Sequence, residues 1–205
     1  MRRRIVSLVI AMVTLFSVFG SSYADVKNFD LIEYLQMNEV GSREELMSVI
    51  SSECHNPDVS MCTYSQAYAC DLNEVEVSFE YVIDYENNVV VFDTVYQSTA
   101  SSYTTSGRAY HDVCSASGNV LYTVAVNATF TRTSQTVTAS SANSTFTPGS
   151  SSSWTSTPTT TRGYISRTQA YARASGVASC PTMSQSYKLT LMCDTSGSLT
   201  STFSS

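Results

Sequence analysis

The stretch that decides the fold is Val120-Leu-Tyr-Thr-Val-Ala-Val-Asn-Ala-Thr-Phe-Thr131. Apolar and polar side chains alternate along it, and successive side chains of a β-strand point to opposite faces. The alternation predicts one long strand whose buried face carries Val120, Tyr122, Val124, Val126, Ala128 and Phe130. The run Ser117-Gly118-Asn119 comes just before it, where a hairpin turn is expected.

Weaker strand patterns lie on both sides of this stretch. Residues 74–86 alternate apolar and acidic side chains, with Val75 and Val77 on the apolar face, and after a turn residues 89–96 return as a second strand. We interpret the acidic row as a solvated face that resists edge-to-edge aggregation. A Ser/Thr-rich linker is expected at residues 98–106. Further strands are expected at residues 108–114, at residues 133–147 as one strand or a pair, and at residues 164–174 and 187–193. Short strands separated by turns are typical of an antiparallel sandwich.

Residues 28–50 show a helical period instead of a strand period. Apolar residues recur there at three- and four-residue spacing, and either Asp30 or Asn28 can serve as the N-cap. A second short helix is expected after Gly41, where Ser42 and Glu45 fit a capping-box pattern. Helices this short are marginal alone, so we expect them to pack on the larger β-structure.

The first residues have the order of a secretory signal peptide. Three arginines from Arg2 precede an apolar run over residues 5–19, and Ser22-Tyr23-Ala24 supplies a cleavage site before Asp25. An uncleaved anchor is the alternative, because the apolar run is only slightly shorter than a membrane span. We expect cleavage and a secreted protein with no stable membrane anchor. The expected parts are a signal peptide at residues 1–24, an acidic helical segment with a cysteine loop at 25–70, and a β-sandwich at 71–205.

Six cysteines follow the expected cleavage site: Cys54, Cys62, Cys70, Cys114, Cys180 and Cys193. An even number in an exported chain predicts up to three disulfides, and fifteen connectivities remain open. His55 beside Cys54 raises the possibility of a metal site, but the tight cysteine pairs of zinc sites are missing from the sequence. We therefore expect neither a metal nor another cofactor.

Charge is distributed unevenly along the chain. Nearly all of the 17 acidic residues lie between Asp25 and Asp93, with only Lys27 and Arg43 against them in that span. The acidic segment either packs against the mildly basic C-terminal part or keeps a weakly charged sandwich in solution. The acidic balance argues against nucleic acid as a partner, since phosphate binding needs clustered lysine and arginine.

Catalytic motifs are missing from the sequence. There are two histidines, His55 and His111, and neither a G-x-S-x-G nor an S-x-x-K motif occurs. Asp112 follows His111 directly and would point to the opposite face of a strand, so the two cannot form a His–Asp pair. We expect His111 on a strand surface, no catalytic residue and no enzymatic activity. A carboxylate pair distant in sequence remains open.

One set of aromatic and basic residues could form a binding surface for a glycan or a protein. Its members are Trp154, Arg162, Tyr164, Arg167, Tyr171 and Arg173. Aromatic rings with arginine give a large contact area at low entropic cost. The alternative, which we favour, places Trp154 and Tyr171 in the core and the arginines in water, because a sandwich with so few aliphatic residues needs its aromatic rings inside.

Part of the chain resembles a family of small exported proteins of gut and other Gram-positive bacteria. The resemblance is carried by Ser117-Gly-Asn-Val-Leu-Tyr-Thr-Val-Ala-Val-Asn-Ala-Thr-Phe-Thr131, the Ser/Thr-rich middle, and Leu189-Thr-Leu-Met-Cys-Asp-Thr-Ser-Gly197. It covers roughly residues 103–201, and its motifs are loose. The resemblance implies an acidic helical N-terminal segment and an immunoglobulin-like β-sandwich of unknown function, with no catalytic residues to transfer. This chain departs from the family in its higher cysteine content.

Together these patterns predict a mainly β, disulfide-stabilised, secreted protein. The function expected is a non-enzymatic extracellular module that binds an unidentified protein or glycan. A secreted antibacterial or toxin-like effector is the alternative, suggested by small size and Ser/Thr richness, and a hydrolase comes third.

Overall fold

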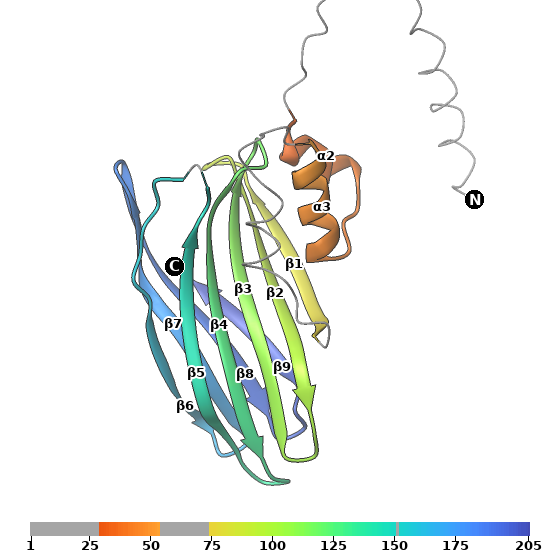
Figure 1. The fold of residues 1–205 in the computed structure, drawn as a ribbon, viewed down its shortest axis with the longest axis vertical. Helices are drawn as coiled ribbons and strands as arrows, with labels where there is room; N and C mark the ends of the chain where they lie inside the picture. Colours follow the sequence, from red (N-terminus) through yellow and green to blue (C-terminus); the bar gives the residue numbers. More distant parts are fainter. Residues whose placement is uncertain (1–28, 54–73, 151) are drawn as a thin grey trace, which may run out of the picture.

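The computed structural model describes residues 29–53, 74–150 and 152–205, which form two antiparallel β-sheets and two short helices (Figure 1). The helices are α2 (Leu31–Met37) and α3 (Arg43–Glu53). The first sheet contains β1 (Val75–Asp84), β2 (Val89–Ala100), β3 (Thr104–Ser115), β4 (Val120–Arg132) and β5 (Val137–Pro148). The second contains β6 (Thr159–Ser166), β7 (Gln169–Cys180), β8 (Met183–Asp194) and β9 (Leu199–Ser204). The mainly β, antiparallel architecture with short N-terminal helices is as predicted.

Each sheet is a simple meander. The strand orders are β1-β2-β3-β4-β5 and β6-β7-β8-β9, so all hydrogen-bonded neighbours in the described chain are consecutive in sequence. Immunoglobulin domains instead connect their strands as Greek keys, with long connections between the sheets. The observed strand order therefore differs from the immunoglobulin-like topology that the resemblance implies.

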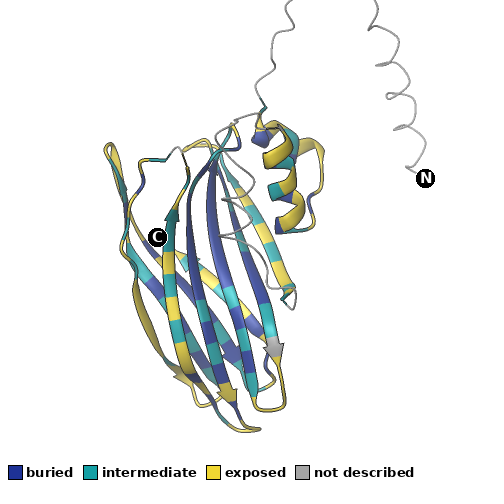
Figure 2. Cartoon of the chain, viewed as in Figure 1, coloured by how far each residue is buried: buried dark blue, intermediate teal, exposed yellow. Residues whose placement is uncertain are grey.

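The sheets enclose one core, to which β4 contributes the large side chains. Tyr122, Val124, Val126, Ala128 and Phe130 all point from β4 toward the second sheet, as the alternation predicted. Alanines from β7 and leucines from β8 face them, namely Ala170, Ala172, Ala174, Ala178, Leu189 and Leu191. Small residues on β7 let the sheets approach closely where β4 and β8 supply bulk. Buried positions are concentrated in β3 and β4, whereas β6 is mostly exposed (Figure 2).

Val120 is the exception to the predicted face of β4. Val113 pairs with Tyr122, but Cys114 pairs with Val120, so one extra residue is inserted into β4 at this point. Such a bulge changes the phase of the side-chain alternation, so residues before and after it face differently from the predicted pattern. Val120 accordingly packs on the outer face of the first sheet, in a second cluster with Val90.

The two helices cover the outer face of β1 and β2 through this second cluster (Figure 1). Asp30 is the N-cap of α2, and its carboxylate accepts hydrogen bonds from the backbone of Ile32 and Glu33 at 2.9 and 3.0 Å. The Ser42 hydroxyl accepts from the Glu45 backbone at 3.1 Å, which confirms the predicted cap of α3. Leu31, Leu35, Leu46 and Ile50 then bury their side chains against β2 and β3, together with Val90, Phe92 and Cys114.

The first strand departs from its predicted pattern. A register shift lies between Glu76 and Ser78, so the side-chain alternation changes phase there. Val75 and Val77 are exposed, contrary to expectation, while Glu76 is half-buried and accepts hydrogen bonds from the Arg43 backbone and the Tyr96 hydroxyl, both at 3.2 Å. The acidic row is therefore only partly a solvated face.

Three further features of the two sheets differ from the prediction. The expected linker at residues 98–106 is largely strand, at the end of β2 and the start of β3. The single strand expected at residues 164–174 is divided between β6 and β7 by a turn at Arg167 and Thr168. The last strand, β9, was not predicted at all.

The expected signal peptide and the boundary between residues 70 and 71 lie outside the described residues. Within the described ranges, no helix combines the length and the apolar character needed to cross a membrane.

Candidate functional site

A cleft of about 750 Å³ opens between the two sheets on the side of β1 and β2. The cleft arises because the second sheet covers less area than the first. The short strand β9 pairs only with the second half of β8, from Lys188 to Cys193. The beginning of β8 therefore has no β9 beside it, and the inner faces of β1 and β2 extend beyond the second sheet.

The walls of the cleft are mostly apolar. Aliphatic side chains come from the first sheet, and aromatic rings come from both sheets and from the connection before β6: Val82, Val89, Val91, Val113, Leu121, Tyr122, Trp154 and Phe203. The rings of Tyr122 and Trp154 lie 5.1 Å apart between centroids. Burial raises the pKa of Tyr122 to about 12, so its phenol stays neutral at physiological pH.

A histidine–aspartate pair lies inside the cleft. His111 on β3 and Asp93 on β2 are cross-strand partners, and the His111 Nδ1 atom lies 2.8 Å from an Asp93 carboxylate oxygen. The Phe203 ring stacks on the imidazole, with centroids 3.4 Å apart and planes 3° apart. His111 is 3% exposed, so the expectation of a surface histidine was wrong.

Sequence reasoning excluded Asp112 as the partner of His111 but missed Asp93. The exclusion is confirmed, because Asp112 points to the outer face and bonds to Arg43. Asp93 could have been found by aligning the two strands of the β2–β3 hairpin. The sequence does not supply that alignment, because the Ser/Thr-rich residues 98–106 predict a linker and not the ends of two paired strands.

The mouth of the cleft is polar and acidic. Asp84 accepts hydrogen bonds from the Asn87 side chain at 2.7 Å and backbone at 3.1 Å, which lower the pKa of this carboxyl and keep it ionised. Thr182 in the turn between β7 and β8, and Ser184 and Gln185 at the start of β8, also line the cleft. Among the described residues that line the cleft there is no lysine or arginine.

Cys180 also lines the cleft, and its thiol is more accessible than that of Cys193, which is buried. Hydrogen bonds from the Thr182 side chain and backbone lower the pKa of Cys180. Burial in the core raises the pKa of Cys193 to about 11.

The disulfides expected from the cysteine count are not seen in the described residues. Cys180 and Cys193 are free thiols, and no bridge joins Cys114 to either of them. Cys54, Cys62 and Cys70 lie outside the described residues.

The residues of the predicted aromatic–arginine surface are divided among four places. Trp154 is buried in the core. Arg162 and Tyr164 lie across from Ala172 and Ala170, whereas Tyr171 and Arg173 point to the other face of the second sheet, with the Arg173 guanidinium 4.5 Å from the Tyr171 ring centroid. Arg167 is exposed in the turn between β6 and β7. The six side chains therefore do not form one binding surface.

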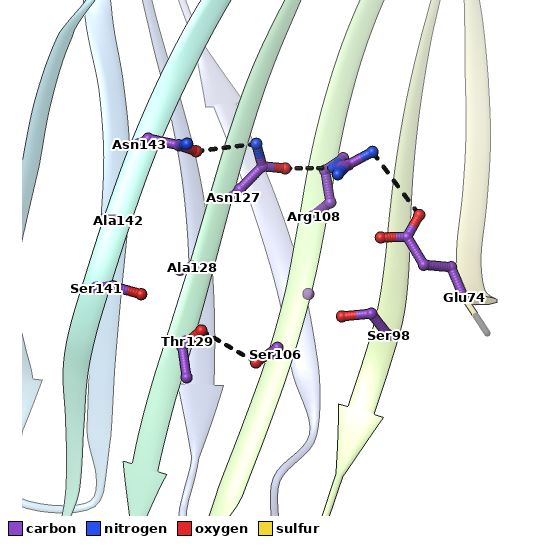
Figure 3. A pocket seen from close by; sticks show the side chains of 11 residues that line it. Glu74, Ser98, Ser106, Arg108, Asn127, Ala128, Thr129, Ser141, Ala142 and Asn143 are labelled. Carbon is purple, nitrogen blue, oxygen red and sulfur yellow. Dashed lines mark hydrogen bonds and ion pairs between the residues drawn. The ribbon is translucent and has the colours of Figure 1, made fainter. Parts of the chain in front are cut away.

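A second, smaller depression of about 240 Å³ lies on the outer face of the first sheet (Figure 3). Its polar side chains bond to one another across the strands. Arg108 donates to Asn127, Asn127 donates to Asn143 at 2.9 Å, and the Arg108 guanidinium lies 3.8 Å from Glu74. Because these groups already satisfy each other, we assign the depression to stabilisation of the sheet and not to ligand binding.

A buried ion pair joins the helices to the first sheet and lies outside the cleft. Arg43 at the start of α3 bonds to both carboxylate oxygens of Asp112, at 2.8 and 3.1 Å, and lies over the Tyr110 ring at 4.4 Å. Burial alone would lower the pKa of Arg43, but the charge and hydrogen bonds of Asp112 outweigh it and raise that pKa above its usual value. Both side chains are almost completely buried.

Within the described ranges, no three histidine, cysteine or acidic side chains are grouped so that they could hold a metal ion. Comparison of the chain with protein-family models, curated proteins and solved structures gave no match.

Proposed function

We propose that this protein is an exported, non-enzymatic binding module whose cleft holds a small molecule with an elongated apolar body. The observation that carries the proposal is the cleft of about 750 Å³ with apolar walls and a polar mouth. Small-molecule sites have volumes of roughly 300–1,000 Å³ and combine mostly apolar walls with a few polar groups.

The apolar inner faces of β1 and β2 give the ligand its driving force. Val82 is 66% exposed, and Val89 and Val91 line the cleft beside it. Covering such surface contributes about 25 cal/mol per Å² of apolar area removed from water. The sequence left a protein or a glycan open as partner. The cleft favours a small apolar molecule, because a sugar would have to place its hydroxyl groups against valine side chains.

The single tryptophan gives a direct binding test. Trp154 lines the cleft, and the chain contains no other tryptophan. We expect saturable energy transfer from Trp154 to the neutral probe N-phenyl-1-naphthylamine, whose absorption overlaps tryptophan emission. Absence of saturable transfer would refute the proposal.

Two exposed valines provide a matched pair of variants. Val82 lines the cleft, and Val177 on β7 is 53% exposed but does not. Both substitutions Val82→Arg and Val177→Arg should leave the fold intact, since surface changes away from special features have small effects on stability. We expect Val82→Arg alone to weaken probe binding, by about tenfold or more. Equal affinity of the two variants for the probe would show that the probe binds outside the cleft.

Export and disulfide formation are proposals that rest on the sequence. Expression in a secreting host should yield a mature chain that starts at Asp25, which N-terminal sequencing can check. With Cys180 and Cys193 as free thiols, the other four cysteines can form at most two bridges. Titration of the denatured, unreduced protein should then find two thiols; six would exclude disulfides.

A further inference from the structure

The charges around the cleft indicate what kind of head group its ligand carries. Two carboxylates, Asp84 and Asp93, line it, and Asp84 is held ionised by Asn87. His111 is the one basic side chain among the described lining residues, and its Nδ1 atom is already engaged with Asp93 at 2.8 Å. The other titratable side chains in the lining are Tyr122 and Cys180. An anionic head group would therefore meet two negative charges with one imidazole to offset them.

We propose that the ligand carries an organic cation, a primary or quaternary ammonium, on its apolar body. This inference rests on the proposed function and specifies its ligand class. The Asp93 side chain is 35% exposed, so a carboxylate faces the cleft where a cation can approach it. Attraction between opposite charges is stronger in a partly desolvated cleft than in water.

The aromatic rings of the cleft fit the same ligand. Tyr122 and Trp154 form a tilted pair in the lining, and Phe203 of β9 also lines the cleft, with one face of its ring stacked on His111. The faces of aromatic rings carry negative potential and attract ammonium groups, tryptophan most strongly. Aromatic rings together with carboxylates and without lysine or arginine form an environment that selects a cation over an anion.

The test compares three ligands that share a ten-carbon chain and differ in the head group. Decyltrimethylammonium, decanol and decanoate are titrated below their aggregation limits, and Trp154 fluorescence reports binding. We expect decyltrimethylammonium to bind about tenfold more tightly than decanoate, with decanol between them. Equal affinity for all three would overturn the cation assignment and leave the proposed function standing. Failure of all three to bind would refute the proposed function itself.

Charge-matched variants separate the cleft from the acidity of the whole protein. Asp93→Asn and Asp84→Asn each remove one negative charge inside the cleft, and Glu44→Gln removes one from an exposed position of α3, on the other face of the first sheet. We expect each cleft variant to reduce the preference for the cation severalfold and Glu44→Gln to leave it unchanged. An equal loss in all three variants would assign the preference to net charge and overturn the inference. Two cleft variants are used because Asp93→Asn also alters the contact with His111.

Discussion

At the scale of single residues, the buried pair of Arg43 and Asp112 fixes the helices to the sheet. The Asp112 carboxylate also accepts a hydrogen bond from Thr123 of β4, so α3, β3 and β4 meet at one carboxylate. Such a group is costly to bury and is stable only with its partners in place.

Removal of the Arg43 side chain should therefore destabilise the protein strongly. Arg43→Ala leaves a buried carboxylate without its counter-ion, and we expect the free energy of unfolding to fall by about 3–5 kcal/mol. Urea denaturation followed by circular dichroism measures the change. Arg167→Ala, at an exposed turn position, is the control. A loss below about 1 kcal/mol for Arg43→Ala would show that the pair does not anchor the helices.

Two buried threonines should respond in opposite directions to the same substitution. Thr94 is completely buried, and in the described part of the chain its hydroxyl has no hydrogen-bond partner, whereas the Thr123 hydroxyl donates to Asp112. Thr94→Val should raise the free energy of unfolding by about 1 kcal/mol, and Thr123→Val should lower it by about 1–3 kcal/mol. Thermal unfolding of both variants measures these changes. Destabilisation by Thr94→Val would contradict the prediction and show that the Thr94 hydroxyl makes a hydrogen bond.

The lowered pKa of Cys180 predicts how its alkylation depends on pH. The thiolate is the reacting form, so the rate rises with pH, and its half-maximum should lie below that of an ordinary thiol. Thr182→Ala removes the side-chain hydrogen bond and should move the half-maximum to higher pH. Iodoacetamide labelling of the folded, reduced protein with mass spectrometry measures this, and Cys193, with its pKa near 11, serves as the unreactive reference. Identical profiles for Cys180 in the parent and in Thr182→Ala would contradict the assigned cause.

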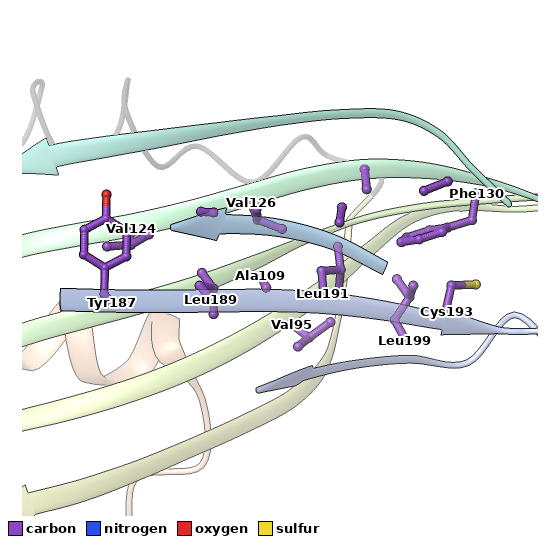
Figure 4. Packing of buried hydrophobic residues seen from close by; sticks show 14 of the residues in the cluster. Val95, Ala109, Val124, Val126, Phe130, Tyr187, Leu189, Leu191, Cys193 and Leu199 are labelled. Carbon is purple, nitrogen blue, oxygen red and sulfur yellow. The ribbon is translucent and has the colours of Figure 1, made fainter. Parts of the chain in front are cut away.

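At the scale of elements, β4 holds the sandwich together. Phe130 and Val124 lie at the interface with Leu191 of β8, and all three are completely buried (Figure 4). We expect Phe130→Ala to cost about 3–5 kcal/mol, because the small alanines of β7 cannot move in to fill the cavity. The control is Thr131→Ala, at the exposed next position. A Phe130→Ala protein with parental stability in urea would show that the fold does not depend on this strand.

Elements with strong local signals could be predicted from the sequence, and those defined by pairing could not. The helices had caps at Asp30 and Ser42, and β4 had an uninterrupted alternation. The bulges that expose Val77 and turn Val120 outward arise from strand register, which is not encoded in either strand alone. The turn at Arg167 lacks glycine and proline, so the sequence predicts one strand over residues 164–174, where the structure has the end of β6 and the start of β7.

At the scale of the whole molecule, unequal sheets create the candidate site. A five-stranded sheet faces a four-stranded one whose last strand is short, and the excess surface becomes a cleft. The sequence predicted two-layered packing but not this mismatch, since β9 carries only Leu199 and Phe203 as apolar side chains. For the same reason the pairing of Asp93 with His111 could be found only in three dimensions.

Photo-labelling tests the central claim, that the cleft between the sheets binds an apolar molecule, most directly. A neutral decyl chain bearing a diazirine would be irradiated with the folded protein, and the labelled peptides would be identified by mass spectrometry. We predict that labels concentrate at residues 89–93, at Trp154 and at residues 182–185, all of which line or adjoin the cleft, and that excess decanol suppresses them. Labels confined to the helices or to the outer face of β4 and β5, or labels that decanol does not suppress, would contradict it.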